Sequence, residues 1–218
     1  MHQQSLICLC SMLQVLVSVK AEPASNVLPT ELEVVVNNLS SDMPTHMLAV
    51  YSRHVPAATK RRVTLFPIHN IILAAHCANL PILPPSNVTR PDAVGSTISL
   101  PMVPLCIPAP DVFSQLSTFL YTKRIDHLLA SLMPCPVPHP IYRGDPTSER
   151  VRFLLQQFSN KLATNYDTQT LLTHAMAVNG LWRNACALGI DDGKLWCALD
   201  VAWEILIGAL AVSTGNCF

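Results

Sequence analysis

Apolar residues in the last third of the chain recur at the three- and four-residue spacing of a helix. The first such series follows Asp145-Pro146, a pair that suits a helix start, because Asp caps free amides and Pro fits the first turn. The series comprises Val151, Leu154, Leu155, Phe158 and Leu162. One apolar face at this spacing predicts a helix that packs on one side.

Two more helices are predicted behind it. The second is capped by Asp167 or Thr168 and ends near Gly189, and the third runs over residues 194–212. The third is apolar nearly all round, but Asp200 and Glu204 lie in its middle. An aspartate there opposes insertion into a bilayer by about 2.5 to 3.5 kcal/mol. We therefore expect a helix buried in a bundle and no transmembrane span.

Asp200 and Glu204 lie four residues apart on one helical face, where like charges repel each other. Two interpretations remain open. The pair is either a solvated stripe on a core helix or a site for a cation or a partner.

The front part of the chain predicts shorter elements, because β-branched and aromatic residues favour strands. Strands are expected over residues 32–36, 47–51, 62–66, 97–100 and 103–107. Short helices are expected over residues 69–79, 111–121 and 125–133, with Asp111 capping the second. The proline-rich stretches 80–91 and 135–140 are expected to be a loop and an extended linker. The fold class is therefore α+β.

The prolines favour a boundary near Gly144-Asp145-Pro146. All eighteen lie between Pro23 and Pro146, and proline disrupts helix interiors, so only the chain behind them permits long helices. We expect three parts. They are a leader-like or disordered segment over residues 1–44, an α+β module over 45–145 and a three-helix, all-α subdomain over 146–218.

Composition narrows the classes of function. Half of the residues are hydrophobic and 13% are charged, so the chain can bury a core. Fourteen Lys and Arg balance fourteen Asp and Glu, and this zero net charge does not favour direct nucleic-acid binding. Only seven glycines are present, which argues against glycine-rich phosphate loops.

The N-terminus leaves localisation open. Residues 6–19 are apolar and run into Val19-Lys20-Ala21, so residues 1–21 have the form of a signal peptide. The segment before the apolar run, residues 1–4, lacks the Lys or Arg that a signal peptide usually carries there. Two of the eight cysteines, Cys8 and Cys10, lie in this leader-like segment, and the other six show no paired spacing. Cys186 and Cys197 lie in apolar helical patterns. We therefore expect buried, reduced thiols in a nuclear or cytoplasmic protein. A secreted or membrane-associated, cysteine-stabilised protein is the alternative.

Candidate chemistry is sparse. The chain lacks Cys-x-x-Cys, His-Glu-x-x-His, Gly-x-Ser-x-Gly and phosphate-loop patterns. On a helix His69 and His76 would lie about 10.5 Å apart, too far for two zinc ligands at about 2 Å each. We expect no catalytic residue, metal or cofactor. A metal-dependent enzyme that gathers His69, His76, Asp200 and Glu204 is the enzymatic alternative.

Residues 66–77 resemble the opening helix of a BTB/POZ domain, in which a strand and a His precede an aliphatic-Leu-Ala-Ala run. Residues 110–122, with Phe113 and Leu120-Tyr121-Thr122, resemble a later helix of that family. The resemblance covers about residues 45–133. It implies a small sheet with helices that binds other proteins or a second copy of itself. The loop at 80–91 replaces a helix that such domains usually have.

Several shorter segments resemble the clampless family of mushroom-forming and smut fungi. They are residues 61–67, 74–81 and 120–124 and the tail with Asn179-Gly180-Leu181-Trp182. That family consists of developmental regulators linked to clamp-cell formation and the mating-type pathway. The resemblance implies a non-enzymatic interaction module with protein partners, transcriptional regulators among them, and no direct contact with nucleic acid. The residues expected to make such contacts are His69, Ile72, His76, Tyr121, Asp200 and Glu204.

Overall fold

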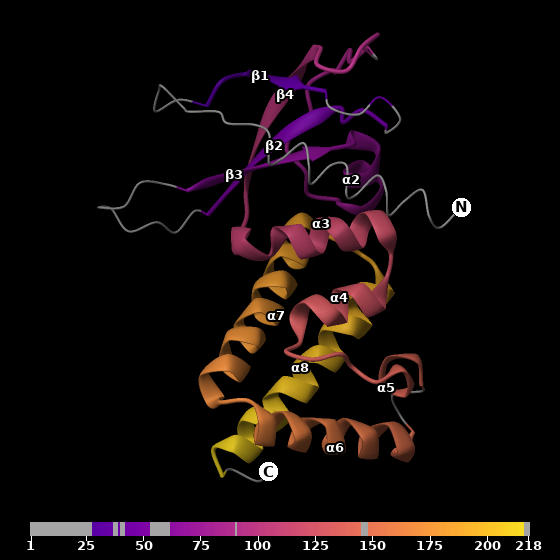
Figure 1. Ribbon diagram of the computed structural model, residues 1–218, viewed down its shortest axis with the longest axis vertical. Helices are drawn as coiled ribbons and strands as arrows, with labels where there is room; N and C mark the ends of the chain where they lie inside the picture. The colour runs from indigo at the N-terminus through magenta and orange to yellow at the C-terminus, as the bar shows by residue number, and fades with distance from the viewer. Residues whose placement is uncertain are drawn as a thin grey trace. The chain divides into compact units, whose positions relative to one another are not determined.

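The computed structural model describes residues 28–36, 39, 42–52, 62–89, 91–144 and 148–215, so the leader-like residues 1–21 lie outside the described part. The chain forms two compact units. The first unit holds the described residues up to 110 together with 120–122 and 187–190, and the second holds 111–119, 123–186 and those from 191 onwards. Figure 1 labels the elements of both units. The predicted boundary near residue 145 stays a prediction.

The first unit is built on a four-stranded sheet. Its strands are β1 (Glu31–Val35), β2 (His46–Tyr51), β3 (Val63–Ile68) and β4 (Thr97–Cys106), in the order β1-β4-β2-β3. The strand β2 pairs with β3 as an antiparallel hairpin and with β4 in parallel. A parallel pair needs a crossover connection, and here it contains the helix α2 (Asn70–His76).

Apolar side chains from three strands form a core on this sheet. The cluster comprises Val34, Val36, Met47, Ile98 and Leu100. Alternate residues of β4 are buried as far as Met102, as expected for a strand with one face on a core. Strand formation and this alternation confirm an α+β fold in the front part of the chain.

The strand β4 is continuous, so the prediction of two strands separated at Pro101 is wrong. Its first half, 97–101, pairs with β1, and its second half, 102–106, pairs with β2. The N–H of Met102 donates toward β1, to the Thr30 carbonyl, and that of Ile107 donates toward β2, to the Tyr51 carbonyl. Successive amides of a strand point to opposite sides. The N–H that Pro101 lacks would point toward β2, and the β2–β4 pairing begins only at Met102. The N–H that Pro104 lacks would point toward β1, and the β1–β4 pairing has already ended at Pro101, so neither proline removes a bond of the sheet.

The helix α2 ends three residues earlier than the predicted limit of residue 79. Cys77 leaves the helix to form a β-bridge with Ile190. Next to it the N–H of Asn79 donates to the Leu188 carbonyl at 3.0 Å, and Asn79 Nδ2 donates to the Ala187 carbonyl at 3.4 Å. These carbonyls belong to the last turn of the helix α7 (Thr168–Leu188) and have no partner within it. Asn79 therefore caps the C-terminus of that helix.

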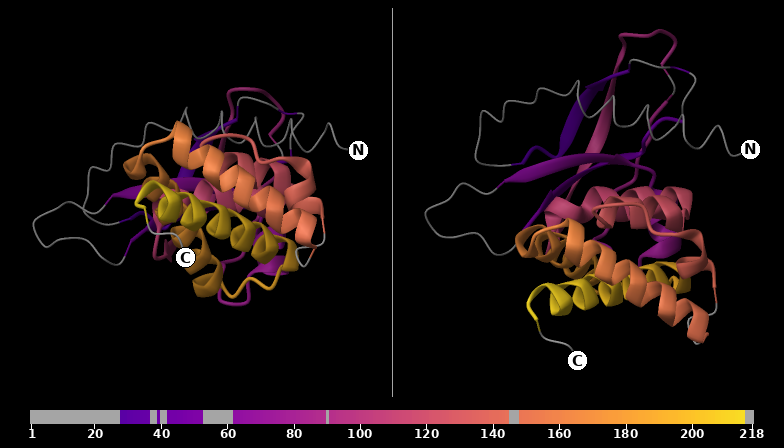
Figure 2. Two further views of the ribbon diagram at one scale, coloured as in Figure 1. Left: turned by 90° about the horizontal axis from the view of Figure 1, so that it is seen from below. Right: turned by 60° about the horizontal axis from the view of Figure 1, so that its bottom comes forward.

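The second unit is helical, and a few end residues of its elements (110, 120–122 and 187–188) belong to the first unit. A 3₁₀ turn (Pro110–Val112) leads into α3 (Phe113–Thr122), followed by α4 (Ile125–Leu132), α5 (His139–Arg143), α6 (Glu149–Asn165), α7 (Thr168–Leu188) and α8 (Gly193–Ser213). The helix α6 packs against α8, as Figure 2 shows. The pair approaches closely at Gly208, where an added Cβ would lie 3.0 Å from Ser159 Oγ.

The predicted helices of the back part are confirmed, with changes at their ends. Asp167 caps α7 by accepting a hydrogen bond from the Thr170 N–H at 2.6 Å. Asp145-Pro146 lies outside the described residues, and α6 begins at Glu149. The linker predicted over 135–140 is wrong at its end, because Pro140 fits the first turn of α5. Asp111 lies in the 3₁₀ turn and does not cap α3.

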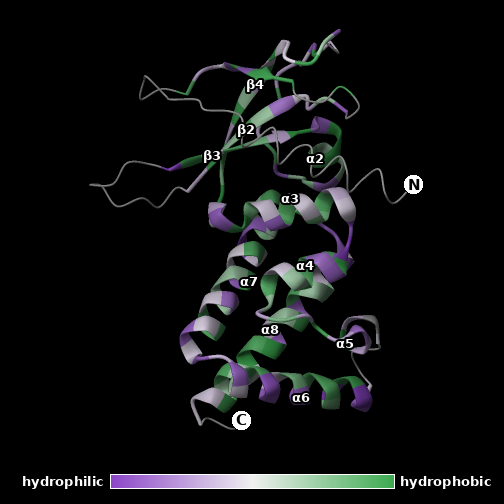
Figure 3. Ribbon diagram, viewed as in Figure 1, coloured by the Kyte–Doolittle hydropathy of each residue, from purple (hydrophilic) through white to green (hydrophobic). Residues whose placement is uncertain are grey.

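The helix α8 is apolar along most of its length, as Figure 3 shows. Within the described part of the chain it is long and apolar enough to cross a membrane by length and composition, and 44% of its most apolar window is buried. Core helices of soluble proteins meet the same criteria. Its side toward the unit's interior includes Leu195, Leu199, Ala202, Ile205, Leu206 and Ala209. A core helix therefore stays our prediction.

Substitution of Gly189 by Ala should destabilise the protein. Gly189 has a φ of +64°, and an added Cβ would lie 2.9 Å from Asn79 Nδ2. We expect a loss of at least about 1–2 kcal/mol, the usual cost of a left-handed conformation for a residue with a side chain. The matched control is Gly193→Ala at the start of α8, where an added Cβ meets nothing within 4 Å. Denaturant unfolding of both variants checks this, and equal stabilities would contradict it.

Candidate functional site

The N-terminus of α2 is held by side chains from distant parts of the first unit. The His69 N–H donates to the Tyr121 hydroxyl at 2.8 Å. The Asn70 N–H donates to Thr45 Oγ1, also at 2.8 Å. The first amides of a helix have no partner within it, so Tyr121 and Thr45 satisfy donors that the helix cannot satisfy itself.

Tyr121 also contacts the His69 ring, so the structure brings these two predicted residues together. The hydroxyl lies 3.1 Å from His69 Nδ1, and the rings meet edge to face with centroids 5.8 Å apart. Because the hydroxyl oxygen accepts the His69 N–H, its proton is available for Nδ1. We therefore assign the ring proton of neutral His69 to Nε2.

His69 Nε2 is buried and has no hydrogen-bond partner among the described residues. Burial lowers the pKa of His69 below its ordinary 6.5, and the Asp42 charge and the carbonyls of Asp42 and Met43 oppose this only in part. His69 is therefore a structural residue that stays neutral at pH 7.

The outward face of α2 is apolar. Leu73 points into the core, and Ile72 and His76 are half-buried. Ile71 is 71% exposed, and Ala74 and Ala75 beside it are exposed as well. Ile71, Ala74 and Ala75 form what we name the α2 face. Sequence reasoning selected Ile72 and missed Ile71, because an all-apolar run does not reveal which side meets the core.

The proline-rich loop is fixed to the sheet by the buried histidine His46, which sequence reasoning missed. His46 is fully buried, with Nε2 2.8 Å from the Pro84 carbonyl and Nδ1 2.9 Å from Thr45 Oγ1. A carbonyl only accepts, so Nε2 carries the proton and Nδ1 accepts from Thr45. The Ser86 hydroxyl adds a 2.6 Å bond to the Thr45 carbonyl. Thr45 thus links the loop, β2 and α2.

Asp200 and Glu204 are exposed on α8, and the structure places both on its outer side with Trp203 between them in sequence. Within the described part of the chain neither carboxylate forms an ion pair. Their position agrees with the predicted stripe, and Trp203 is an exposed neighbour that sequence reasoning did not select.

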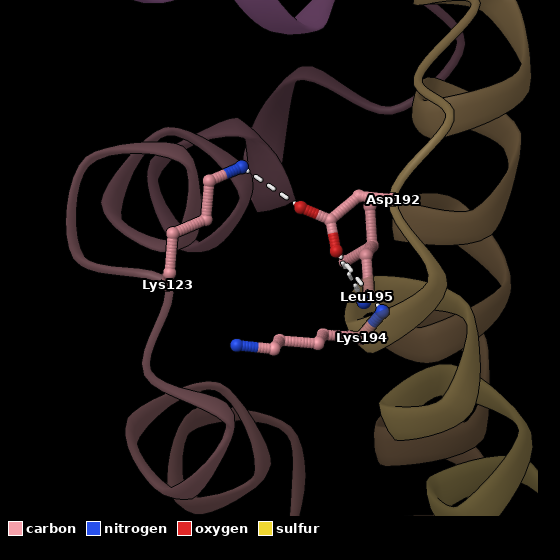
Figure 4. A network of polar contacts seen from close by, with 4 residues as sticks. All are labelled: Lys123, Asp192, Lys194 and Leu195. Atoms are coloured by element: carbon pink, nitrogen blue, oxygen red, sulfur yellow. Dashed lines mark hydrogen bonds and ion pairs between the residues drawn. The ribbon is translucent and has the colours of Figure 1, made fainter.

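A further polar network lies at the start of α8 and is drawn in Figure 4. Lys123 Nζ donates to Asp192 Oδ2 at 2.8 Å. Asp192 Oδ1 accepts from the amides of Lys194 at 3.0 Å and Leu195 at 3.2 Å. Lys123 ends α3 with a φ of 54°, a left-handed conformation that is unusual for a residue other than glycine. This carboxylate therefore caps α8 and fixes the end of α3.

The surroundings of the Asp192 carboxyl change its pKa. Burial opposes its ionisation, but the hydrogen bonds from Lys123 and from the amides of Leu195 and Lys194 outweigh that effect. The pKa of Asp192 consequently lies below its ordinary value. The network is structural, because it uses every oxygen of the carboxylate on the protein itself.

The described residues offer no assembled metal site. They contain no group of three or more His, Cys, Asp and Glu side chains that could hold an ion. Four described cysteines, Cys106, Cys135, Cys186 and Cys197, are free thiols. The prediction that Cys186 and Cys197 are buried is wrong: both are exposed, because the neighbouring Ala185 and Ala198 occupy the buried positions of their helices.

Comparison with known proteins finds relatives of both parts of the chain. The Clampless protein 1 N-terminal domain matches residues 3–108, and the Clampless protein 1 C-terminal domain matches residues 126–217. Two relatives named Clampless protein 1, from two strains of Cryptococcus neoformans var. neoformans serotype D, are 29% identical over 114 residues. That region is 52% of this chain and 21% of each relative. No solved structure matches significantly.

The fold defines an α+β protein whose C-terminal region is helical. Since the two domain matches together cover most of its length, the chain belongs to the clampless protein family. Membership indicates a role in fungal development.

Replacement of Tyr121 by Phe should loosen the start of α2. It removes the acceptor of the His69 N–H, and a buried donor left without a partner costs about 1–3 kcal/mol. Tyr142→Phe is the control, because that hydroxyl bonds only to His139 Nδ1 at the surface among the contacts described; we expect a change below about 0.5 kcal/mol. Hydrogen exchange at the residue 69 amide should accelerate in the first variant alone. Equal exchange in both variants would refute this role.

Charge removal at Asp192 should change the response to acid. Its pKa is lowered in the fold, so its stabilisation is present above the unfolded value of about 3.9 and is lost as the pH falls through the folded value. Asp192→Asn should therefore lower the free energy of unfolding at pH 7. At pH 3 the free energies of unfolding of the variant and the wild type should differ less than at pH 7. Asparagine still caps a helix, whereas Asp192→Ala should cost about 1 kcal/mol more.

Asp191→Asn is the control for this experiment, because the neighbouring Asp191 is exposed and forms no ion pair among the described residues. Urea unfolding at the two pH values measures all three variants. If Asp191→Asn changed stability as much as Asp192→Asn, the network would have no special role.

Proposed function

We propose that this chain is a non-enzymatic protein-interaction module that regulates fungal sexual development, in clamp-cell formation and the mating-type pathway. One observation carries the proposal: α2 presents an exposed apolar face, while the amides of His69 and Asn70 at its start donate to the distant side chains of Tyr121 and Thr45. Family membership supplies the developmental context.

Physical chemistry favours binding at the α2 face. Burial of an isoleucine side chain contributes about 1.5–3 kcal/mol, and Ile71 leaves most of this gain unused because it is 71% exposed. The polar contacts of Thr45 and Tyr121 order the helix before any partner arrives. A preorganised surface loses less conformational entropy on binding.

A BTB/POZ-like scaffold is part of the proposal. It is supported by the order of elements along the chain: a strand hairpin, the short helix α2, the strand β4 in parallel with β2, and then α3. In such a scaffold a second copy of the chain is one candidate partner.

The remaining parts of the proposal concern partners and place. The balance of fourteen basic and fourteen acidic residues supports protein partners, such as transcriptional regulators, over direct binding of nucleic acid. We propose a nuclear or cytoplasmic location, where such partners act. Free thiols at four described cysteines support a reducing compartment.

Ile71→Asp tests the proposal. A charge at the centre of the α2 face should abolish partner binding without unfolding the protein, because the side chain is mostly exposed. In a fungal strain that lacks its own copy of the gene, we expect the wild-type chain to restore clamp cells and the variant to give the same count as an empty vector.

Ile82→Asp is the matched control. Ile82 lies in the proline-rich loop and is 94% exposed, so the same change should keep wild-type clamp-cell counts. Circular dichroism and immunoblots confirm that both variants fold and accumulate. Full complementation by Ile71→Asp would rule out the α2 face as the binding surface.

A further inference from the structure

All three tryptophans of the chain lie on α7 and α8. Trp182 of α7 meets Trp196 of α8 edge to face, with ring centroids 6.4 Å apart. Trp182 is 47% exposed and Trp203 is 42% exposed. Large aromatic side chains are usually well covered in a protein that acts alone, and they are enriched at binding surfaces.

Helical geometry places these rings beside the two carboxylates. At about 100° per residue, Trp196, Asp200, Trp203, Glu204 and Ile207 point to one side of α8, which we name the α8 stripe. Trp196 is half-buried and the other four residues are exposed. The opposite side of the helix carries the buried residues Ala198, Ala202, Ile205 and Ala209.

No Lys or Arg in the described part of the chain forms an ion pair with the two carboxylates of the stripe. Asp200 and Glu204 lie about 6 Å apart along the helix axis, close enough to repel each other. The exposed cations of the same two helices are Arg183 and Lys194, and neither forms an ion pair with them among the described contacts. A cation placed between Asp200 and Glu204 would relieve the repulsion.

We propose that the α8 stripe binds a basic segment of a partner protein. Arginine or lysine side chains of that segment would pair with Asp200 and Glu204 and lie on the face of Trp203 through a cation–π contact. Apolar residues of the segment would cover Ile207. Two negative charges oppose an anionic membrane surface or a nucleic acid, so a basic protein segment is the complementary ligand. The inference extends the proposed interaction function to a surface other than the α2 face.

The test measures binding of a labelled synthetic peptide to the full chain by fluorescence anisotropy. The probe is a helical peptide in which arginine and leucine occupy one face. We expect saturable binding that weakens with added salt. Trp203→Ala, and separately the pair D200N/E204Q, should each weaken binding at least tenfold. The double variant D200N/E204Q also loses the repulsion between the two carboxylates. Its melting temperature should therefore equal that of the wild type or exceed it.

The matched control is the pair D111N/D191N. It removes two exposed carboxylates outside the stripe and therefore changes the net charge equally. We expect it to bind the peptide within twofold of wild type. Equal weakening by both pairs would overturn the proposal in favour of a general charge effect. Binding to phosphatidylserine vesicles that depends on Trp203, with no binding of the peptide, would overturn it in favour of a membrane surface.

The variant Ile71→Asp separates this inference from the proposed function. It should bind the peptide as tightly as wild type, because Ile71 does not belong to the stripe. If D200N/E204Q has no effect on the peptide while Ile71→Asp still abolishes clamp cells, the stripe proposal fails and the α2 proposal stands. If Ile71→Asp fully restores clamp cells and the stripe variants no longer bind the peptide, the α2 proposal fails and the stripe proposal stands.

Discussion

The hydrogen bonds at the start of α2 are the constraint on which the first unit depends. An isolated helix of seven residues is unstable in water, because too few internal hydrogen bonds offset the cost of ordering it. Tyr121 and Thr45 accept two amides there, and Thr45 also bonds to His46, which fixes the proline-rich loop. At the other end Cys77 continues into a β-bridge. With both ends fixed, the helix can expose an apolar face and keep its shape.

The second unit applies the same principle at a helix start. Asp192 satisfies two amides of α8 and one cation at the end of α3, so a single carboxylate sets the position of two helices. Because these polar groups are used up internally, they are poor candidates for chemistry. Asp200 and Glu204, which form no ion pair among the described residues, lie on the outer side of α8. Both units therefore fix their helices with internal polar contacts and expose residues suited to binding.

Much of the fold followed from the sequence, and the errors have a common physical cause. Local periodicity predicted α6, α7 and α8 and the strands β1 to β3, because the pattern of each depends on its own residues. The continuity of β4 through Pro101 could not be predicted, since it depends on which neighbour each half of the strand pairs with. The exposure of Ile71 and of Cys186 depended likewise on packing partners. His69 and Tyr121 were selected through the family resemblance, and their contact across 52 residues had no local signal.

The central claim is that the α2 face meets a protein partner, and photo-crosslinking inside the fungus tests it most directly. A photoreactive amino acid is placed at residue 71 or, as the reference, at residue 82, and the products are separated by mass. The account predicts one discrete crosslinked species from position 71 and none from position 82. No species above the monomer at position 71, or the same set of products from both positions, would contradict it.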